Sequence, residues 1–271
     1  WSIPLERFKD VRKIYFRYSD LNFSIKNQLI NETEINQIVS GLQVLSKFKG
    51  LPQFEWIEEI VTRIEHAFSL KGKSETIIDF DSNIYLKGIN FLGELFNSIL
   101  YKKVLLITYH SFKSLFPIEI EFHPYFLKQY NNRWFVFGSN PDFDNITNLA
   151  LDRIIKIAEI QKEYIENSCC DFNEYFEDVI GVTVNPEDEL VKTTLWVRND
   201  LVPYIKTKPI HGSQKYIGED EKGMTISIEI IPNYEFEQVI LNHGERIKVL
   251  DPPELREKVV NRLKEAYENY I

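Results

Sequence analysis

Side chains that could bind an anion gather in the middle of the sequence, near the ends of short predicted strands. A guanidinium forms charge-assisted hydrogen bonds with phosphate or carboxylate groups, and hydroxyl and imidazole groups suit phosphate recognition. The candidates for such a site are Tyr109, His110, Ser111, His123, Arg133 and Arg153. Their residue types and their positions predict a binding site for an anion.

Arg153 is the most specific of these candidates. It stands between apolar neighbours in a predicted strand, and burying an arginine without a partner is costly. Asp152 is a poor partner for it, because neighbouring residues of a strand point to opposite faces. Arg153 therefore either faces an anionic ligand or forms a structural pair with another carboxylate, and the sequence leaves both open.

The remaining candidates also have structural alternatives. A single histidine is most often a hydrogen-bonded structural residue, and His110 is the stronger of the two histidine candidates. Arg133 follows the turn at Asn131-Asn132, where it is either a solvated charge or part of a basic lining. Phe112 and Phe116 flank a lysine in a predicted loop; they could stack on bases, although such aromatics more often pack beneath their loop.

A second, weaker group stands at the start of a later predicted strand: His211, Ser213 and Gln214. These side chains could cap the ligand site of a neighbouring domain, or hydrogen-bond within their own sheet. The sequence contains no GxSxG, HExxH, P-loop or GxGxxG motif. Asp79 and Asp81 lack further ligands at metal-binding spacing, so a capping role is favoured. We therefore expect no enzyme activity, no catalytic residue, no metal ion and no cofactor.

The elements that must position these residues follow from hydrophobic periodicity. Residues 5–18 are basic and end in an alternating aromatic run, which predicts a strand pair. Apolar residues recur at helical spacing within 31–50 and 52–68, which predicts a helical hairpin, and again within 88–101.

From residue 104 the period changes to that of strands. Strands are predicted over 104–109, 118–122, 126–130, 133–138 and 149–157. Such short, closely spaced strands indicate a small bent sheet or barrel.

The last third of the chain shows a more regular order. Strands over 190–197, 212–217, 224–231 and 246–250 alternate with helices over 200–206 and 235–242. This βαββαβ order is that of a ferredoxin-like split unit. A final helix follows, with Asp251 as its expected cap. The fold class is therefore α+β.

Charge is distributed unevenly along the chain. The net charge of -9 argues against a protein that coats nucleic acid through bulk electrostatics. Residues 102–164 hold eight Lys or Arg and seven Asp or Glu, whereas residues 171–271 hold twelve and twenty. An anion-binding surface is therefore expected in the middle of the chain.

The cellular setting is indicated by what the sequence lacks. It has two adjacent cysteines and no CxxC pattern, so no disulfide framework is expected. It contains no apolar run of the ~18–20 residues that a membrane span needs, and it opens without the pattern of a signal peptide. We expect a cytoplasmic protein, with no membrane partner.

Four segments, in order, resemble the WYL domain: residues 107–111 (ITYHS), 123–127 (HPYFL), 133–136 (RWFV) and 151–154 (LDRI). The family's Trp-Tyr-Leu tripeptide corresponds here to Trp134-Phe135-Val136, so the tyrosine hydroxyl is missing. Two later segments resemble the C-terminal extension that often follows WYL domains: residues 209–214 (PIHGSQ) and 246–252 (RIKVLDP).

The resemblance implies a domain order. Residues 1–20 are expected to be the wing left from a winged helix-turn-helix, 21–101 a helical linker, 102–166 an Sm-like β-barrel, and 171–271 the ferredoxin-like extension. No recognition helix is expected within this chain.

It also implies a function: the effector-sensing part of a bacterial transcription regulator. The expected partners are a nucleotide or short single-stranded nucleic acid in the WYL domain, duplex DNA through the winged helix of the full-length protein, and a second copy in a homodimer. Two alternatives remain: a barrel that binds nucleic acid directly, and an interaction module that holds a dimer together without a ligand.

Overall fold

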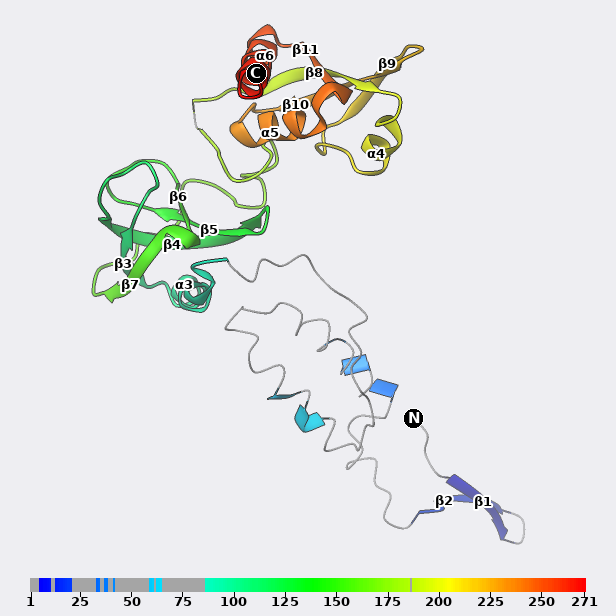
Figure 1. Ribbon diagram of the computed structural model, residues 1–271. Helices are drawn as coiled ribbons and strands as arrows, with labels where there is room; N and C mark the ends of the chain where they lie inside the picture. The colour runs from blue at the N-terminus through cyan, green and yellow to red at the C-terminus, as the bar shows by residue number, and fades with distance from the viewer. Residues whose placement is uncertain are drawn as a thin grey trace. The chain divides into compact units, whose positions relative to one another are not determined.

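The structure is a computed structural model that describes residues 5–10, 13–20, 33–34, 37–38, 41, 59–60, 62–64, 86–185 and 187–271. The chain divides into two units, residues Trp1–Tyr85 and residues Leu86–Ile271 (Figure 1). All the candidate site residues lie in the second unit.

In the first unit, β1 (Leu5–Asp10) and β2 (Lys13–Tyr18) pair antiparallel, which confirms the predicted strand pair. The rings of Phe8 and Tyr15 stack with their centroids 5.5 Å apart. The described residues between 33 and 64 are helical. Most of the predicted helical hairpin, and both Asp79 and Asp81, lie outside the described residues.

The second unit begins with a short helical segment and a five-stranded antiparallel sheet. Its elements are η2 (Ile89–Phe91), α3 (Leu92–Leu100), β3 (Val104–Tyr109), β4 (Ile118–Tyr130), β5 (Arg133–Ser139), β6 (Thr147–Ala150), η3 (Leu151–Arg153) and β7 (Ile154–Ile160). The strands lie in the order β6-β5-β4-β3-β7. The predicted turn is confirmed, because Asn131 and Asn132 have φ of 47° and 57°.

Two strand predictions in this sheet are wrong. The predicted strands 118–122 and 126–130 form one strand, β4, whose register shifts between Pro124 and Phe126. A proline without an N–H group is tolerated at such an irregularity. The predicted strand 149–157 is interrupted by the 3-10 turn η3. Leu149, Ala150 and Leu151 are all buried, so an unbroken apolar run concealed the turn.

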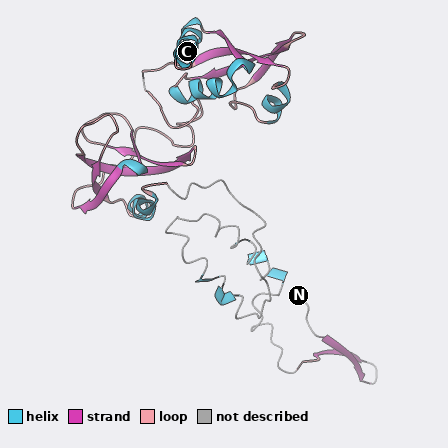
Figure 2. Cartoon of the chain, viewed as in Figure 1, coloured by secondary structure: helices cyan, strands magenta, loops and turns pink. Residues whose placement is uncertain are grey.

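The second sheet of this unit has the predicted βαββαβ order. Its strands are magenta and its helices cyan in Figure 2. Its elements are β8 (Val191–Arg198), α4 (Val202–Thr207), β9 (Lys215–Glu219), β10 (Gly223–Ile230), α5 (Tyr234–His243), η4 (Gly244–Arg246), β11 (Ile247–Asp251) and α6 (Pro253–Glu268). The strands pair antiparallel in the order β11-β8-β10-β9.

One hydrophobic core joins this sheet to its three helices. Its buried members include Leu195 and Ile228 from strands, Ile205 from α4, Phe236 from α5 and Leu255 from α6. The predicted cap of the last helix is wrong, since Asp251 ends β11 and Pro252 occupies the capping position.

The segment between the two sheets contacts both of them. Phe172 and Phe176 lie 4.8 Å and 6.1 Å from the ring of Phe126, which belongs to β4. On the other side, Asn233 donates side-chain hydrogen bonds to the backbone oxygens of Ile180 (2.7 Å) and Thr183 (2.9 Å). The two sheets of the second unit are therefore linked by a packed and hydrogen-bonded connection.

Candidate functional site

Arg153 is the last residue of η3, so the prediction that it lies in a strand is wrong. Its backbone oxygen accepts a hydrogen bond from His110 N at 3.0 Å. Its guanidinium carbon lies 4.6 Å from the centroid of the Phe112 ring. Its Nε atom is buried and has no hydrogen-bond partner within the part of the chain that the structure describes. The side chain therefore retains a buried donor that an anion could satisfy.

Contacts from two other segments, at Tyr109 and Gly88, fix the turn that carries Arg153. The hydroxyl oxygen of the buried Tyr109 accepts a hydrogen bond from Ala150 N at 3.3 Å. Gly88 has φ of +79°, and a Cβ atom there would lie 2.0 Å from the backbone oxygen of Leu151. Only glycine allows this close approach, so Gly88 helps to fix η3. Sequence reasoning missed its role because the contact joins residues far apart in the chain.

His110 and Ser111 follow β3 and lie beside this turn. His110 Nε2 is 3.1 Å from the backbone oxygen of Ser114, and Ser111 Oγ accepts a hydrogen bond from Lys113 N at 3.3 Å. The backbone bond from His110 to Arg153 shows that η3 lies beside the end of β3. The structure thus brings together Arg153 and the three residues from 109 to 111.

Arg133 lies close to this turn but is already engaged. Its Nε atom is 3.3 Å from Asp152 Oδ2, and the Asp152 side chain is only 11% exposed. The sequence left open whether Arg133 is a solvated turn charge or part of a basic lining. In the structure its positive charge is balanced by the carboxylate of Asp152. Asp152 is the neighbour of Arg153 in sequence, so this ion pair also fixes the turn.

His123 is not brought to the site. It lies in the middle of β4 rather than at a strand end, and it is 1% exposed. Its Nδ1 atom accepts a hydrogen bond from Ile165 N at 3.1 Å. Burial lowers the pKa of its imidazole, although the nearby Glu121 favours the charged form. His123 pairs with Ser139 at one end of β5, whereas Arg133 begins the other end.

Comparison with protein families matches both sheets of this unit. The family model of the WYL domain matches residues 90–159, and that of the WCX domain matches residues 189–267. Together the two matches cover more than half of the chain. The chain belongs to the WYL-domain family. Its WYL match begins inside η2, so α3 lies within the matched range although sequence analysis placed it in the linker.

Solved structures similar to this WYL-domain chain differ from it strongly in sequence. Proteasome accessory factor B/C (PafBC) of Arthrobacter aurescens is 14% identical with a TM-score of 0.30, over 85% of this chain and 34% of that chain. A CRISPR Cas-related protein is 12% identical with a TM-score of 0.42, over 93% of this chain and 75% of that one. This chain therefore spans about a third of the PafBC chain. No curated protein matches the chain.

The secondary candidates in the WCX domain precede β9 instead of beginning a strand. His211 lies 2.7 Å from Ser213 Oγ and 2.6 Å from the backbone oxygen of Glu177. Ser213 Oγ donates to the backbone oxygen of Glu229 at 2.7 Å. Gln214 accepts from Ile210 N and donates to the backbone oxygen of Ile205. The Ser213 bond to Glu229 joins it to β10, whereas His211 bonds to the segment before the sheet and Gln214 bonds to α4, so the alternative of bonding within the sheet describes Ser213 and not the other two.

The loop between β3 and β4 of the WYL domain exposes large apolar side chains. Phe112, Leu115 and Phe116 are 72%, 89% and 76% exposed, so the expectation that such aromatics pack beneath the loop is wrong. Phe112 covers the guanidinium of Arg153 on one side. An exposed ring beside a cation, as Phe112 is beside Arg153, is suited to stacking on a planar ligand.

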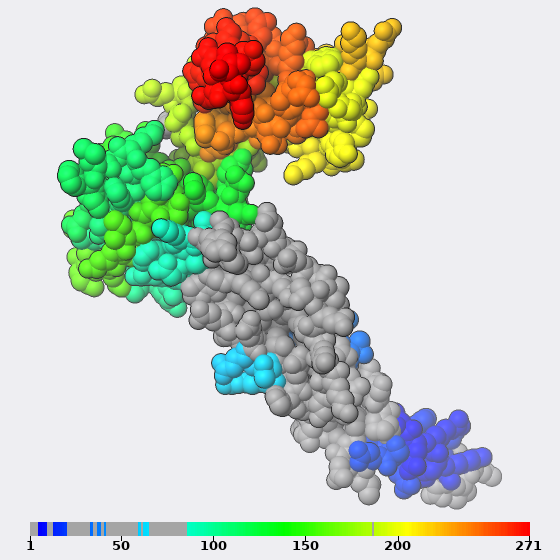
Figure 3. Space-filling view, in the orientation of Figure 1, coloured from blue at the N-terminus to red at the C-terminus, as the bar shows by residue number. Residues whose placement is uncertain are grey.

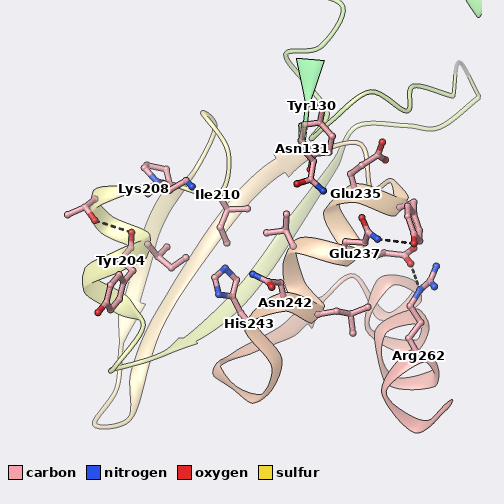
Figure 4. Close-up of a pocket in the computed structure, with 17 residues that line it drawn as sticks. Tyr130, Asn131, Tyr204, Lys208, Ile210, Glu235, Glu237, Asn242, His243 and Arg262 are labelled. Carbon is pink, nitrogen blue, oxygen red and sulfur yellow. Dashed lines mark hydrogen bonds and ion pairs between the residues drawn. The ribbon is translucent and has the colours of Figure 1, made fainter. Parts of the chain in front are cut away.

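A cavity of about 1100 Å³ lies between the β4–β5 turn of the WYL domain and the helices of the WCX domain (Figure 4). Tyr130 and Asn131 reach it from the turn, Tyr204 from α4 and His243 from α5. At one side Arg262 Nε is 2.6 Å from Glu237 Oε2. None of the predicted ligand residues lines this cavity, and the separate segments that form it gave no sequence signal.

The described residues contain neither a candidate metal site nor a helix suited to cross a membrane. No group of three or more His, Cys, Asp or Glu residues there is arranged to hold a metal ion. No described helix is both long enough and apolar enough to cross a membrane.

Proposed function

We propose that the WYL domain binds an anionic effector at Arg153, of the class of a nucleotide or a short single-stranded nucleic acid. The observation that carries this proposal is the buried Arg153 Nε atom, which has no hydrogen-bond partner among the described residues. A buried donor left without a partner costs about 1–3 kcal/mol. An anion oxygen that reaches this nitrogen, once the exposed Phe112 ring that covers the guanidinium moves aside, removes that cost and adds a charge-assisted hydrogen bond.

The neighbouring residues complete the proposed site. His110 and Ser111 lie beside Arg153 and supply an imidazole and a hydroxyl group. Tyr109 fixes the turn through its hydrogen bond with Ala150 N. The exposed rings of Phe112 and Phe116 offer stacking surfaces for a base. An effector that carries both a phosphate and a base fits this combination of a cation and aromatic rings.

In this proposal the chain is the sensing part of a cytoplasmic transcription regulator, and it is a binding module without catalysis. The hairpin of β1 and β2 is the wing of a DNA-binding module, and its Arg7, Lys9, Lys13 and Arg17 are exposed. A homodimer would couple effector binding in the WYL domain to the way two DNA-binding modules are presented.

The proposal is tested by measuring anion binding to the wild type, to Arg153→Ala and to Lys156→Ala. Lys156 is an exposed lysine of β7 near the site, so its loss is the matched control for removal of one positive charge. The probes are a panel of nucleoside mono- and diphosphates and a labelled single-stranded oligonucleotide, measured by calorimetry and fluorescence anisotropy.

We expect Arg153→Ala to weaken binding by about 10- to 100-fold, because one charge-assisted bond contributes roughly 1.5–3 kcal/mol. Lys156→Ala should change the affinity by less than about threefold, as expected for a screened surface charge. The melting temperature of Arg153→Ala should stay close to that of the wild type. A loss of about 3–5 kcal/mol in stability without any change in binding would instead show a structural arginine. Equal binding by both variants would also contradict the proposal.

A further inference from the structure

The cavity between the WYL and WCX domains is large enough to hold a small molecule. Its volume of about 1100 Å³ is comparable with the largest of the pockets, of roughly 300–1,000 Å³, that bind such ligands. Residues of α4, α5 and α6 line it from the WCX domain, and the β4–β5 turn reaches it from the WYL domain (Figure 4). In Figure 3, α5 is orange and the WYL domain is green. A ligand in this cavity contacts both domains.

Aromatic and aliphatic side chains form much of the lining. The ring of Tyr130 comes from the WYL turn, that of Tyr204 from α4 and that of Tyr234 from α5. Ile210 and Val239 also line the cavity and are only partly buried. Covering partly exposed apolar surface is favourable, because that surface is removed from water. The lining therefore favours a ligand with an apolar or aromatic body.

The two carboxylates at the cavity are mostly covered by protein. The Glu237 side chain is 9% exposed, and its Oε2 atom is 2.6 Å from Arg262 Nε. Glu235 is 6% exposed, and its Oε1 atom accepts a hydrogen bond from Thr183 Oγ1 at 2.8 Å. The Glu235 Oε2 atom has no partner among the described residues, but it is buried as well. The cavity therefore offers little accessible negative charge to a cationic ligand.

The groups that remain for a ligand are a cation and hydrogen-bonding side chains. Lys208, at the C-terminal end of α4, is exposed and has no carboxylate partner within the described part of the chain. Asn131 reaches the cavity from the WYL turn, and the exposed Asn242 reaches it from α5. Burial and the nearby Arg246 lower the pKa of His243, so its imidazole adds a hydrogen-bonding group without a charge at pH 7. An ammonium group together with amide donors is suited to an anion.

We propose that this cavity binds a small organic carboxylate with an apolar or aromatic body. The carboxylate lies at Lys208, and the body lies against the tyrosine rings and the aliphatic side chains. The sign of the ligand charge follows from accessibility, since Lys208 is exposed whereas Glu235 and Glu237 are buried. The cavity shares no residue with the anion site at Arg153, so this inference does not rest on the proposed function.

The test compares ligands that share a body and differ in charge. Indole-3-acetate, indole-3-acetamide and tryptamine are titrated into the full 271-residue chain by calorimetry, followed by 3-phenylpropionate with its amide and 3-phenylpropylamine. Each carboxylate should bind at least about fivefold more tightly than its amide, because charge-assisted hydrogen bonds are roughly twice as strong as neutral ones. The amines should bind most weakly. Tighter binding of the amines, or no binding of either carboxylate up to about 5 mM, overturns the inference.

Variants of the lining locate the bound carboxylate. Lys208→Ala should weaken the binding of indole-3-acetate by about 5- to 10-fold, because it removes the ammonium partner. The matched control is Lys206→Ala, which removes an exposed lysine of the same helix that does not line the cavity, and it should change the affinity by less than about twofold. Asn131→Gly removes the amide while glycine retains the positive φ of the turn, so it should weaken binding by about threefold with little loss of stability.

Two further variants separate this cavity from the anion site of the WYL domain. Binding of indole-3-acetate should persist in Arg153→Ala. Gln238→Trp should abolish it, because a large ring on the exposed side of α5 fills the cavity. Thermal melts check that each variant folds, and the exposed Lys208 keeps the test decisive if the tryptophan perturbs folding. Binding that is lost in Arg153→Ala but retained in Lys208→Ala and Gln238→Trp places the carboxylate at the WYL domain and overturns the inference.

Discussion

Lys128 of β4 provides a test of how the two sheets of the second unit are joined. Its Nζ atom lies 3.3 Å from the centroid of the Phe176 ring, in the connection between the WYL and WCX domains. Burial lowers the pKa of Lys128 from 10.5 to about 8, and the negative charge of Glu235 only partly opposes this effect. A positive charge at this position therefore costs free energy in the folded state. We expect Lys128→Met to stabilise the chain at pH 7.

The magnitude follows from the lowered pKa. A change from 10.5 to about 8 corresponds to at most about 3.4 kcal/mol, at 1.36 kcal/mol for each pKa unit. Because the side chain is only partly buried, solvent screening reduces this value to about 1–2 kcal/mol. Loss of the cation–π contact with Phe176 offsets part of the gain, by about 0.5–1 kcal/mol. A net stabilisation of about 1 kcal/mol remains.

The lowered pKa of Lys128 also predicts how stability changes with pH. Between pH 8 and 10.5 the folded wild type has released this proton while the unfolded chain still holds it, so wild-type stability rises with pH. Lys128→Met lacks that rise, and its advantage should therefore be largest below pH 8 and shrink toward pH 10. Denaturant unfolding at pH 7 and pH 9.5 measures the difference, with the exposed Lys156→Met as control. A destabilisation that is equal at both pH values would refute the reasoning.

Three further outcomes are expected from the same structure. Gly88→Ala should lower the unfolding free energy by about 2–4 kcal/mol and weaken anion binding, because a Cβ atom would displace η3; thermal melts and the binding assay measure both effects. Arg133→Ala should cost about 1–2 kcal/mol of unfolding free energy, since it leaves the mostly buried Asp152 without its partner, and it should also weaken anion binding, because this ion pair helps to fix the turn that carries Arg153; the same two assays measure both effects. Wild-type stability should fall as pH drops from 7 toward 5, because the lowered pKa of His123 makes its protonation unfavourable in the folded state. His123→Asn should flatten this slope by at most about 1.4 kcal/mol per pH unit, which denaturant unfolding across that range can contradict.

The fold was predictable where the hydrophobic period was clean. In the WCX domain the alternation of β8 and β10 is regular, and the βαββαβ order is confirmed. The turn at Asn131-Asn132 was predictable because asparagine tolerates positive φ. Prediction failed at η3, where consecutive buried residues carry no alternation, and at Pro124, where a bulge lets one strand continue through a proline.

The candidate site was predictable in its residue types but not in its partnerships. The sequence suggested that Tyr109, His110 and Ser111 converge with Arg153, and the pairing of β3 with β7 brings them together. It did not reveal that Arg133 pairs with Asp152, because that contact depends on the position of η3 beside β5. The burial of His123 was missed for a related reason, since its partner Ile165 is 42 residues away.

These partnerships explain why a short turn can hold an arginine in place without a strand around it. The backbone of η3 is fixed by His110 N on one side, by the hydroxyl of Tyr109 on another and by the close approach of Gly88. Asp152 is fixed in turn by Arg133. Arg153 is the residue of this turn whose buried side-chain nitrogen has no protein partner among the described residues. In the proposed function, this fixed backbone favours anion binding, because little conformational entropy remains to be lost when the anion binds.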